Sequence, residues 1–321
     1  MKKLLTILVS VLLMTGCSSV PSSNTPTDSD SNTQAFTTDL KILSPSGAPA
    51  LALLNLFEDN SDQITVVEGA DVLQASFVSP EHEYDVIIAP TNLGVKLALS
   101  GKTDYRLAAV VTWGNLYVLA ENEESLKNDA VRFAAFGEQA VPGLVFESVK
   151  DQLHLDDVTY YSAVTEAQAA LLSKNADAAL IAEPAATATI AKAKEKEMSL
   201  QVVADIQSLW ESKTGSKGYP QASIFVLDTD ENTQKIDDLL TEIEASMNKF
   251  HSEVSNGSTD HLTASIDAAG AETLGVPNAQ IVAKSYLKMG LGYRAASSCE
   301  QELSDFLSLF GISYDSKIAV R

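Results

Sequence analysis

Short apolar runs alternate along this chain with segments whose apolar residues recur at helical spacing. The runs predict strands, at residues 40–43, 64–67, 85–89, 107–111, 116–120, 131–136, 158–161, 178–182, 200–204 and 222–227. Helices are expected between them, at 50–57, 71–77 and 93–99, in a segment ending near 153, and at 165–174 and 184–196. Strands that alternate with helices predict an α/β fold, with a parallel sheet covered on both faces.

The alternation falls into two blocks, and the chain is nearly all helical from Thr233 onward. Residues 210–221 carry Gly and Pro without periodicity, so we expect them to be irregular. The strand at 222–227 can rejoin the first sheet, which would bring the helical tail back to cover the first lobe. We expect lobe 1 to comprise 39–118 and 224–321, and lobe 2 to comprise 119–223. Ligands of open α/β sheets bind beyond the carboxyl ends of the strands. Two facing lobes therefore predict a ligand cleft.

The N-terminus carries an export signal. Lys2 and Lys3 precede an apolar run at 4–14, which is 11 residues long. A membrane-spanning helix needs about 20 apolar residues. The positive start, the short run and the small residues before Cys17 instead predict a secretory signal at 1–16.

The sequence Met14-Thr15-Gly16-Cys17 resembles the lipobox of bacterial lipoproteins, with Met14 where Leu is usual. The resemblance implies cleavage before Cys17 and a diacylglyceryl group on its thiol, whose two acyl chains would give a stable membrane anchor. The alternative is an ordinary signal cut elsewhere, which would leave Cys17 as a free thiol. Residues 18–37 are polar, so we expect 17–38 to form a flexible tether of about 25 Å root-mean-square length.

The net charge excludes some kinds of binding partner, and the cysteine content limits how the fold can be stabilised. The formal charge is −21, and removal of Lys2 and Lys3 with the signal makes it −23. Such a charge argues against nucleic acid or an anionic membrane surface as a partner. Cys17 and Cys299 are the only cysteines. If Cys17 carries lipid, no disulfide can form within the chain, and the hydrophobic core must stabilise the fold.

Three segments carry a family resemblance. Residues 175–184, Asn-Ala-Asp-Ala-Ala-Leu-Ile-Ala-Glu-Pro, resemble the Asp-Ala and Glu-Pro segment of the solute-binding proteins of ABC importers, with Asn175 where Gly is usual. Residues 84–92 resemble the third strand and ligand loop of that fold, and 44–49 its first ligand loop. The branch is that of taurine, nitrate and thiamine-precursor binders.

The resemblance implies a two-lobed fold of the type II periplasmic-binding-protein class. It also implies a monomeric, lipid-anchored receptor on the outer face of a membrane, which captures a small solute and docks on an ABC permease. Neither catalysis nor a cofactor is implied. Closure on the solute would be a hinge motion near 113–120 and 219–224.

Candidate ligand residues follow the expected strands or lie at the crossings between lobes. They are Ser46, Gly47, Ala48, Thr91, Asn92, Trp113, Asn115, Gly137, Glu138, Glu183 and Tyr219. Backbone N–H groups near Ser46 and Gly137 would suit an anion or a carbonyl. Each loop residue also has a local alternative, namely helix capping.

The chemistry of these candidates leaves the ligand open. Trp113 and Tyr219 would stack on a flat heterocycle if both line the cleft, and Asn115 offers a paired donor and acceptor. Glu183 would either accept from an amine or amidine, or lock the start of the following helix. Glu138 would satisfy its own helix terminus, which speaks against phosphate or sulfonate. A small organic anion remains the alternative ligand.

Two other functional classes are compatible with such a scaffold, an exported enzyme and a sensor or adhesin. The histidines show no metal-ligand spacing, and neither a nucleophile elbow nor a P-loop is present in the sequence. We therefore expect no metal site and no catalytic residues.

Overall fold

The computed structural model describes residues 35–127, 130–155 and 157–320. The predicted signal, Cys17 and most of the tether at 17–38 lie outside the described residues, so they stay predictions. From Phe36 onward the chain forms one compact unit, which contains two sheets.

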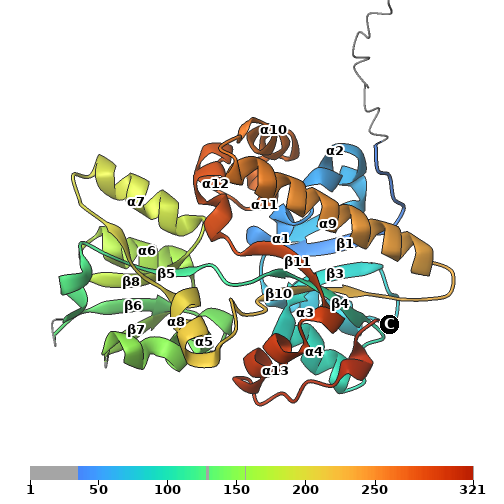
Figure 1. Ribbon diagram of the computed structural model, residues 1–321, viewed down its shortest axis with the longest axis horizontal. Coiled ribbons are helices and arrows are strands. Elements are labelled where there is room, and N and C mark those ends of the chain that lie inside the picture. Colours follow the sequence, from blue (N-terminus) through green and yellow to red (C-terminus); the bar gives the residue numbers. More distant parts are fainter. Residues whose placement is uncertain (1–34, 128–129, 156, 321) are drawn as a thin grey trace, which may run out of the picture. The chain divides into compact units, whose positions relative to one another are not determined.

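The first sheet has six strands in the order β11-β4-β10-β3-β1-β2 (Figure 1). These are β1 (Ile42–Pro45), β2 (Ile64–Val67), β3 (Val86–Pro90), β4 (Arg106–Thr112), β10 (Ala222–Val226) and β11 (Leu291–Ala295). Strand β1 pairs in parallel with β2 and β3, as expected. Strand β10 inserts between β3 and β4 and runs antiparallel to both, so the sheet is mixed rather than parallel.

The second sheet has five strands in the order β7-β6-β8-β5-β9. These are β5 (Leu116–Ala120), β6 (Phe133–Phe136), β7 (Val158–Tyr161), β8 (Ala178–Ala182) and β9 (Gln201–Asp205). Strand β6 is parallel to β7 and β8, whereas β5 is antiparallel to β8 and β9. The chain enters this sheet through 113–115 and leaves it before β10. The lobe limits expected from the sequence stay a prediction.

The described helices are α1 (Ala48–Leu51), α2 (Phe57–Asn60), α3 (Ala70–Val78), α4 (Thr91–Leu99), α5 (Val141–Val149), α6 (Val164–Leu172), α7 (Ala185–Glu195), α8 (Ile206–Thr214), α9 (Thr233–Ser255), α10 (Asp260–Ala269), α11 (Ala271–Leu274), α12 (Ala279–Ser285) and α13 (Glu300–Ser308). Short 3-10 turns lie at Leu54–Leu56, Ser61–Gln63, Glu123–Lys127, Lys150–Leu153, Tyr286–Lys288, Ala296–Ser298 and Ser316–Ile318.

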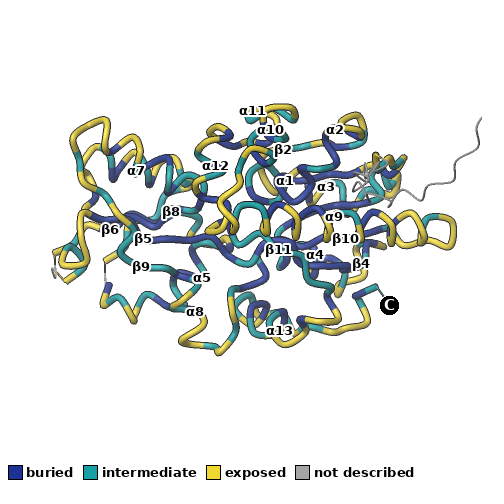
Figure 2. Tube along the Cα trace, turned by 45° about the horizontal axis from the view of Figure 1, so that its top comes forward, coloured by how far each residue is buried: buried dark blue, intermediate teal, exposed yellow. Residues whose placement is uncertain are grey.

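Alternating strand residues divide the core into layers, because successive side chains point to opposite faces. In β3, Ile88 packs with α9, α10 and α12 on one face, whereas Ile87 packs with α3, α4 and α13 on the other. This second cluster continues into the second sheet beneath α5 and α8, while α6 and α7 cover the remaining face. Figure 2 shows the buried residues following the strands through both sheets.

Helix α9 shows why the tail packs on the first sheet. Its buried residues recur at steps of three and four, which places them on one face of the helix. They are Ile236, Leu239, Leu240, Ile243, Ser246, Met247 and Phe250. The other face is polar, so this 23-residue helix has one side suited to covering a sheet.

Two elements differ from the sequence-based expectation. Helix α8 begins inside the second block and runs into 210–221, which we expected to be irregular. Its local signals are strong: Asp205 caps the helix by accepting from the N–H groups of Gln207 and Ser208, and Gly215 ends it with φ +78°. Strand β11 lies in the tail that we expected to be helical. Its residues are all half-buried, so it lacks an apolar run and is held by pairing with β4.

Cys299 lies in the core, at 1% exposure. Burial raises the pKa of its thiol to about 11, so the thiol is protonated at neutral pH.

Candidate ligand-binding cleft

A cavity of about 970 Å³ lies between residues of the two sheets. It opens at the carboxyl ends of β1, β3 and β8, since Pro45, Pro90 and Ala182 are among its lining residues. This is the position at which open α/β sheets bind ligands, and the volume suits a small molecule. We call this cavity the cleft.

Six of the predicted ligand residues line the cleft, namely Ser46, Gly47, Ala48, Asn92, Asn115 and Glu183. They come from the loop after β1, the start of α4, the crossing into the second sheet and the end of β8. Their contact with a ligand stays a prediction, but the structure brings all six to one cavity.

Two predicted residues are packed inside the protein instead. Thr91 is fully buried, and its Oγ1 lies 2.7 Å from Oγ of Ser223 on β10. Tyr219 is also fully buried, and its hydroxyl donates to Oε1 of Gln207 at 3.1 Å. Its ring packs against Trp210. Neither side chain is part of the cleft wall.

Trp113 is held at the crossing by the tail of the chain. Its Nε1 donates to the carbonyl of Gly292 at 2.8 Å, and its backbone N–H donates to the carbonyl of Gly290 at 2.7 Å. The guanidinium of Arg294 lies 4.3 Å from the ring centroid and pairs with Glu302 at 2.7 Å. The indole therefore fastens β11 to the crossing and does not line the cleft.

The loop before α5 contributes different residues from those predicted. The carbonyl of Gly137 accepts from the N–H groups of Ala140 and Gly143, which makes a tight turn. The side chain of Glu138 is exposed outside the cleft, whereas the next residue, Gln139, lines it.

Glu183 locks the start of the following helix, which is one of the two roles considered for it, and its contact with a ligand stays a prediction. Its residue is 3% exposed, and its carboxylate accepts from N–H of Thr187 at 3.0 Å and from Oγ1 at 2.8 Å. These bonds cap the first turn of α7. Burial raises the pKa of Glu183, and the Thr187 hydrogen bonds only partly oppose this. The carboxylate thus closes a helix end and forms part of the cleft wall.

Asn115 and Glu183 are joined by two hydrogen bonds, one from the Asn115 side chain and one between main-chain groups. The side-chain amide of Asn115 donates to the carbonyl of Glu183 at 3.0 Å, and N–H of Glu183 donates to the carbonyl of Asn115 at 2.8 Å. This pair fixes the crossing to the end of β8. It also fixes the orientation of the Asn115 amide, because a rotated amide would place oxygen against oxygen.

Three amide side chains in the cleft wall carry buried oxygens without a hydrogen-bond partner within the described part of the chain. They are Oδ1 of Asn92, Oδ1 of Asn115 and Oε1 of Gln221. The main chain of Gln221 joins two strand ends, since its N–H donates to Thr112 at 2.9 Å and its carbonyl accepts from Thr91 at 3.1 Å. A buried acceptor without a partner is costly. Unpaired acceptors in a cavity wall favour a ligand that donates to them.

The charged residues of the cleft wall are mostly acidic. Glu68, Glu183 and Glu272 line it, with Lys192 as the one cation among the lining residues that the structure describes. No aromatic side chain occurs among those lining residues, and most of the others are Ala, Val, Leu or Pro. The cleft is therefore aliphatic and weakly acidic, with several amide side chains among its lining residues.

Sequence reasoning missed several lining residues, namely Glu68, Gln139, Gln168, Lys192, Gln221, Glu272 and 275–277. Gln221 had a usable signal, because it directly precedes the strand that returns to the first sheet. The tail loop had another. Gly275 has φ +67°, and a Cβ there would lie 2.4 Å from Cβ of Ser46, so the loop packs closely against the residues after β1.

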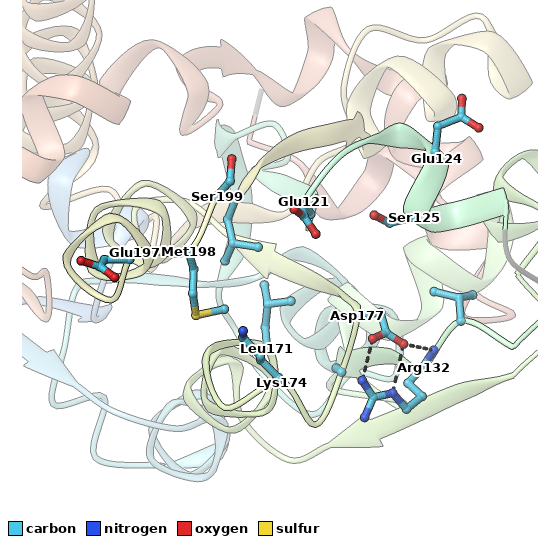
Figure 3. Close-up of a pocket in the computed structure, with 13 residues that line it drawn as sticks. Glu121, Glu124, Ser125, Arg132, Leu171, Lys174, Asp177, Glu197, Met198 and Ser199 are labelled. Carbon is cyan, nitrogen blue, oxygen red and sulfur yellow. Dashed lines mark hydrogen bonds and ion pairs between the residues drawn. The ribbon is translucent and has the colours of Figure 1, made fainter.

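A second, smaller cavity of about 490 Å³ lies at the amino ends of β6 and β8 (Figure 3). Figure 3 shows Arg132 and Asp177 facing each other there, with a guanidinium nitrogen 2.6 Å from a carboxylate oxygen. No residue lines both cavities. The polar contacts of this pair are with each other, so we assign the second cavity no ligand.

No protein-family model and no curated protein matches the sequence. Solved structures do match. An ABC transporter protein from Parabacteroides distasonis has a TM-score of 0.72 and 19% identity, over 88% of this chain and 98% of that chain. The aliphatic sulphonate binding protein SsuA from Escherichia coli has a TM-score of 0.56 and 17% identity, over 85% and 86%.

A third match is the ligand-binding component of an ABC-type import system from Staphylococcus aureus, solved with zinc bound. It has a TM-score of 0.57 and 13% identity, over 88% of this chain and 96% of that chain. None of the described helices combines the length and apolarity that a membrane crossing needs.

The matches with these solved structures and the order of the strands agree. The chain has the two-lobed α/β fold of the substrate-binding proteins of ABC transporters, as its resemblance to type II periplasmic binding proteins implied.

Proposed function

We propose that this chain is the substrate-binding component of an ABC importer and captures a small solute in the cleft. The observation that carries the proposal is a cavity lined from both sheets, three of whose lining residues carry buried amide oxygens without a partner in the described part of the chain. Such groups are expected where a ligand completes the hydrogen bonding. The solved structures of similar fold support the same function, and a monomer that docks on a permease fits it.

Binding rather than catalysis is the better interpretation of the cleft wall. Among its described residues there is no histidine, cysteine or tyrosine, and the carboxylate of Glu183 is engaged in capping α7. Ser46, Thr165 and Lys192 line the wall, but the usual pairing of such a nucleophile with a histidine base is missing from the described lining residues. An exported enzyme or a sensor on this scaffold is the alternative class.

The solute expected from the sequence depended on a condition that the structure does not meet. A flat, thiamine-precursor-like heterocycle was expected on the condition that Trp113 and Tyr219 line the cleft, and neither does. A heterocycle stays a candidate if it binds by donating hydrogen bonds to the cleft wall rather than by stacking on an aromatic side chain. An organic anion such as a sulfonate or carboxylate stays the alternative.

The first prediction concerns ligand binding. Because a ligand that binds only the folded state stabilises it by mass action, the correct solute should raise the melting temperature in a concentration-dependent manner. A screen of the full chain against vitamins, pyrimidines, amines, sulfonates and amino acids, read by differential scanning fluorimetry, would detect this. Native mass spectrometry of the purified protein would identify a solute that copurifies.

The same screen can contradict the receptor function. If no solute in the panel shifts the melting temperature and none copurifies, the proposed function fails. If a solute binds and is chemically changed during incubation, the enzyme alternative is correct.

The second prediction concerns the anchor, which we propose is a lipid on Cys17. Cys17→Ser removes the thiol that would be alkylated, so the variant should leave the membrane fraction for the soluble fraction of the cells that express it. The matched control is Cys299→Ser, whose thiol is buried and should have no part in attachment. Membrane retention of Cys17→Ser would contradict the lipid anchor. Its ligand binding should be unchanged, because Cys17 belongs to the predicted tether and the residues that line the cleft begin at Pro45.

A further inference from the structure

The cleft also carries information about the chemical class of its ligand. An anion at the ends of strands is usually held by free backbone N–H groups of loops and helix termini. Several of these groups are already used here. N–H of Ser46 donates to Val67 at 2.9 Å, and N–H of Gly47 donates to Leu274 at 2.7 Å. Two backbone N–H donors of the loop after β1 therefore already have partners within the protein.

The helices that start at the cleft show the same use of donors. N–H of Thr91, at the start of α4, donates to the carbonyl of Gln221. N–H of Thr187, in the first turn of α7, donates to the carboxylate of Glu183. That carboxyl group already occupies the helix terminus where an anionic ligand would bind.

The unpaired groups of the cleft wall are acceptors instead. Oδ1 of Asn115 is the most informative, because its residue is 5% exposed and its amide orientation is fixed by the bond to Glu183. A carbonyl-type oxygen can only accept, so a ligand group that reaches it must donate. The buried oxygens of Asn92 and Gln221 add to this pattern.

The charged residues point the same way. Glu68 and Glu272 are exposed at the cleft and Glu183 is buried in its wall. Lys192 is the one lining residue of opposite charge in the described part of the chain. An excess of acidic groups around a cavity raises the local concentration of cations and lowers that of anions.

We propose that the ligand is a small neutral or cationic solute that presents N–H or O–H donors to Asn115, such as an amine, an amidine or an amino-substituted ring, and not an organic anion. This inference rests on the proposed function. The aliphatic remainder of the wall would contact the carbon skeleton of the solute.

The test compares probes of matched size on the full chain. Benzamidine is paired with benzoate, n-butylamine with butane-1-sulfonate, and 4-aminopyrimidine with 4-methylpyrimidine. Binding is measured by saturation-transfer NMR at millimolar concentration. We expect the first member of each pair to bind at least about tenfold more tightly, since one hydrogen bond to a buried acceptor accounts for about a factor of ten.

Three variants connect this preference to the cleft. Asn115→Leu removes the buried acceptor and should weaken the donor probes about tenfold. Since it also removes the bond to Glu183, two exposed positions serve as variants that leave the core intact. Lys192→Gln removes a positive charge, so benzamidine should bind more tightly or equally well. Glu272→Gln removes a negative charge, so the binding of benzamidine should weaken about twofold to fivefold, whereas the binding of 4-aminopyrimidine should not change.

The outcomes separate the ligand class from the receptor function. Binding of benzoate or butane-1-sulfonate that is weakened by Lys192→Gln would overturn the class and leave the receptor function standing. A copurified solute without donors would do the same. If no probe binds and nothing copurifies, both the class and the receptor function are wrong.

Discussion

The carboxylate of Glu183 has an unusual setting, because it is buried and faces a helix start and a cavity at once. Burial raises its pKa above the value of about 4.3 that it has in an unfolded chain. Between these two values the folded protein binds more protons than the unfolded chain, so the contribution of this group to stability falls as pH rises. Glu302 is the opposite case. Burial is the largest single influence and acts to raise its pKa, but the hydrogen bond from Arg294, a backbone hydrogen bond and the Arg294 charge together outweigh burial and leave the pKa lowered.

Replacing each of these two carboxylates by an amide should change the free energy of unfolding in opposite directions. Glu183→Gln keeps an acceptor for Thr187 and removes a buried charge, so at pH 7 it should not lower the free energy of unfolding of the ligand-free protein, and should raise it slightly. Glu302→Gln breaks a partly exposed ion pair and should lower it by about 1 kcal/mol. Urea unfolding at pH 7 and pH 4 measures both, and the difference between each variant and the parent should shrink at pH 4. A clear loss of stability in Glu183→Gln at pH 7 would contradict this.

At the scale of elements, the segment around β11 fastens the tail to the crossing between sheets. Gly290 has φ +63°, and a Cβ there would lie 2.0 Å from the carbonyl oxygen of Gly114. Gly311 has nearly the same dihedral, φ +65°, but nothing lies within 4 Å of its Cβ position. The two glycines therefore separate the cost of the left-handed conformation from the cost of close packing.

The prediction is that Gly290→Ala loses about 3 kcal/mol or more of unfolding free energy, because the main chain of the crossing must move. Gly311→Ala should lose only about 1 kcal/mol, which is the cost of the dihedral alone. Urea unfolding of both variants beside the parent tests this. Equal losses would mean that the contact between β11 and the crossing contributes nothing.

Sequence reasoning was reliable for elements and weak for side-chain direction. The buried strands of both sheets were predicted because they are continuous apolar runs, whereas β11 was missed because Gly292 and Arg294 interrupt its apolar residues. Trp113 and Tyr219 were placed correctly near the crossings, but periodicity does not specify which way a side chain points there. Gln221 was missed because an amide before a strand has no pattern of its own. Its importance depends on which strand ends meet.

At the scale of the whole molecule, one hydrophobic cluster runs through both sheets. It includes Leu107 and Val110 of β4, Leu116 and Val118 of β5, and Trp210 of α8. Because these side chains share a core, neither sheet can lose its packing without exposing residues of the other. The two sheets should then unfold together.

The prediction is a single urea transition for the ligand-free full chain. Tryptophan fluorescence reports on Trp113 at the crossing and Trp210 in the second block, whereas far-ultraviolet circular dichroism reports on all helices and strands. The two signals should give the same midpoint. Two separated midpoints would show that the shared cluster does not couple the sheets.

The position of β10 between β3 and β4 has a consequence for biosynthesis. A ribosome releases the chain from its N-terminus, so β3 and β4 emerge long before Ala222, with the whole sequence of the second sheet in between. Until then the first sheet has a gap at its centre that the segments already made cannot fill. The growing chain therefore cannot close its first core early, and this would keep it open during export if residues 1–16 act as the proposed signal.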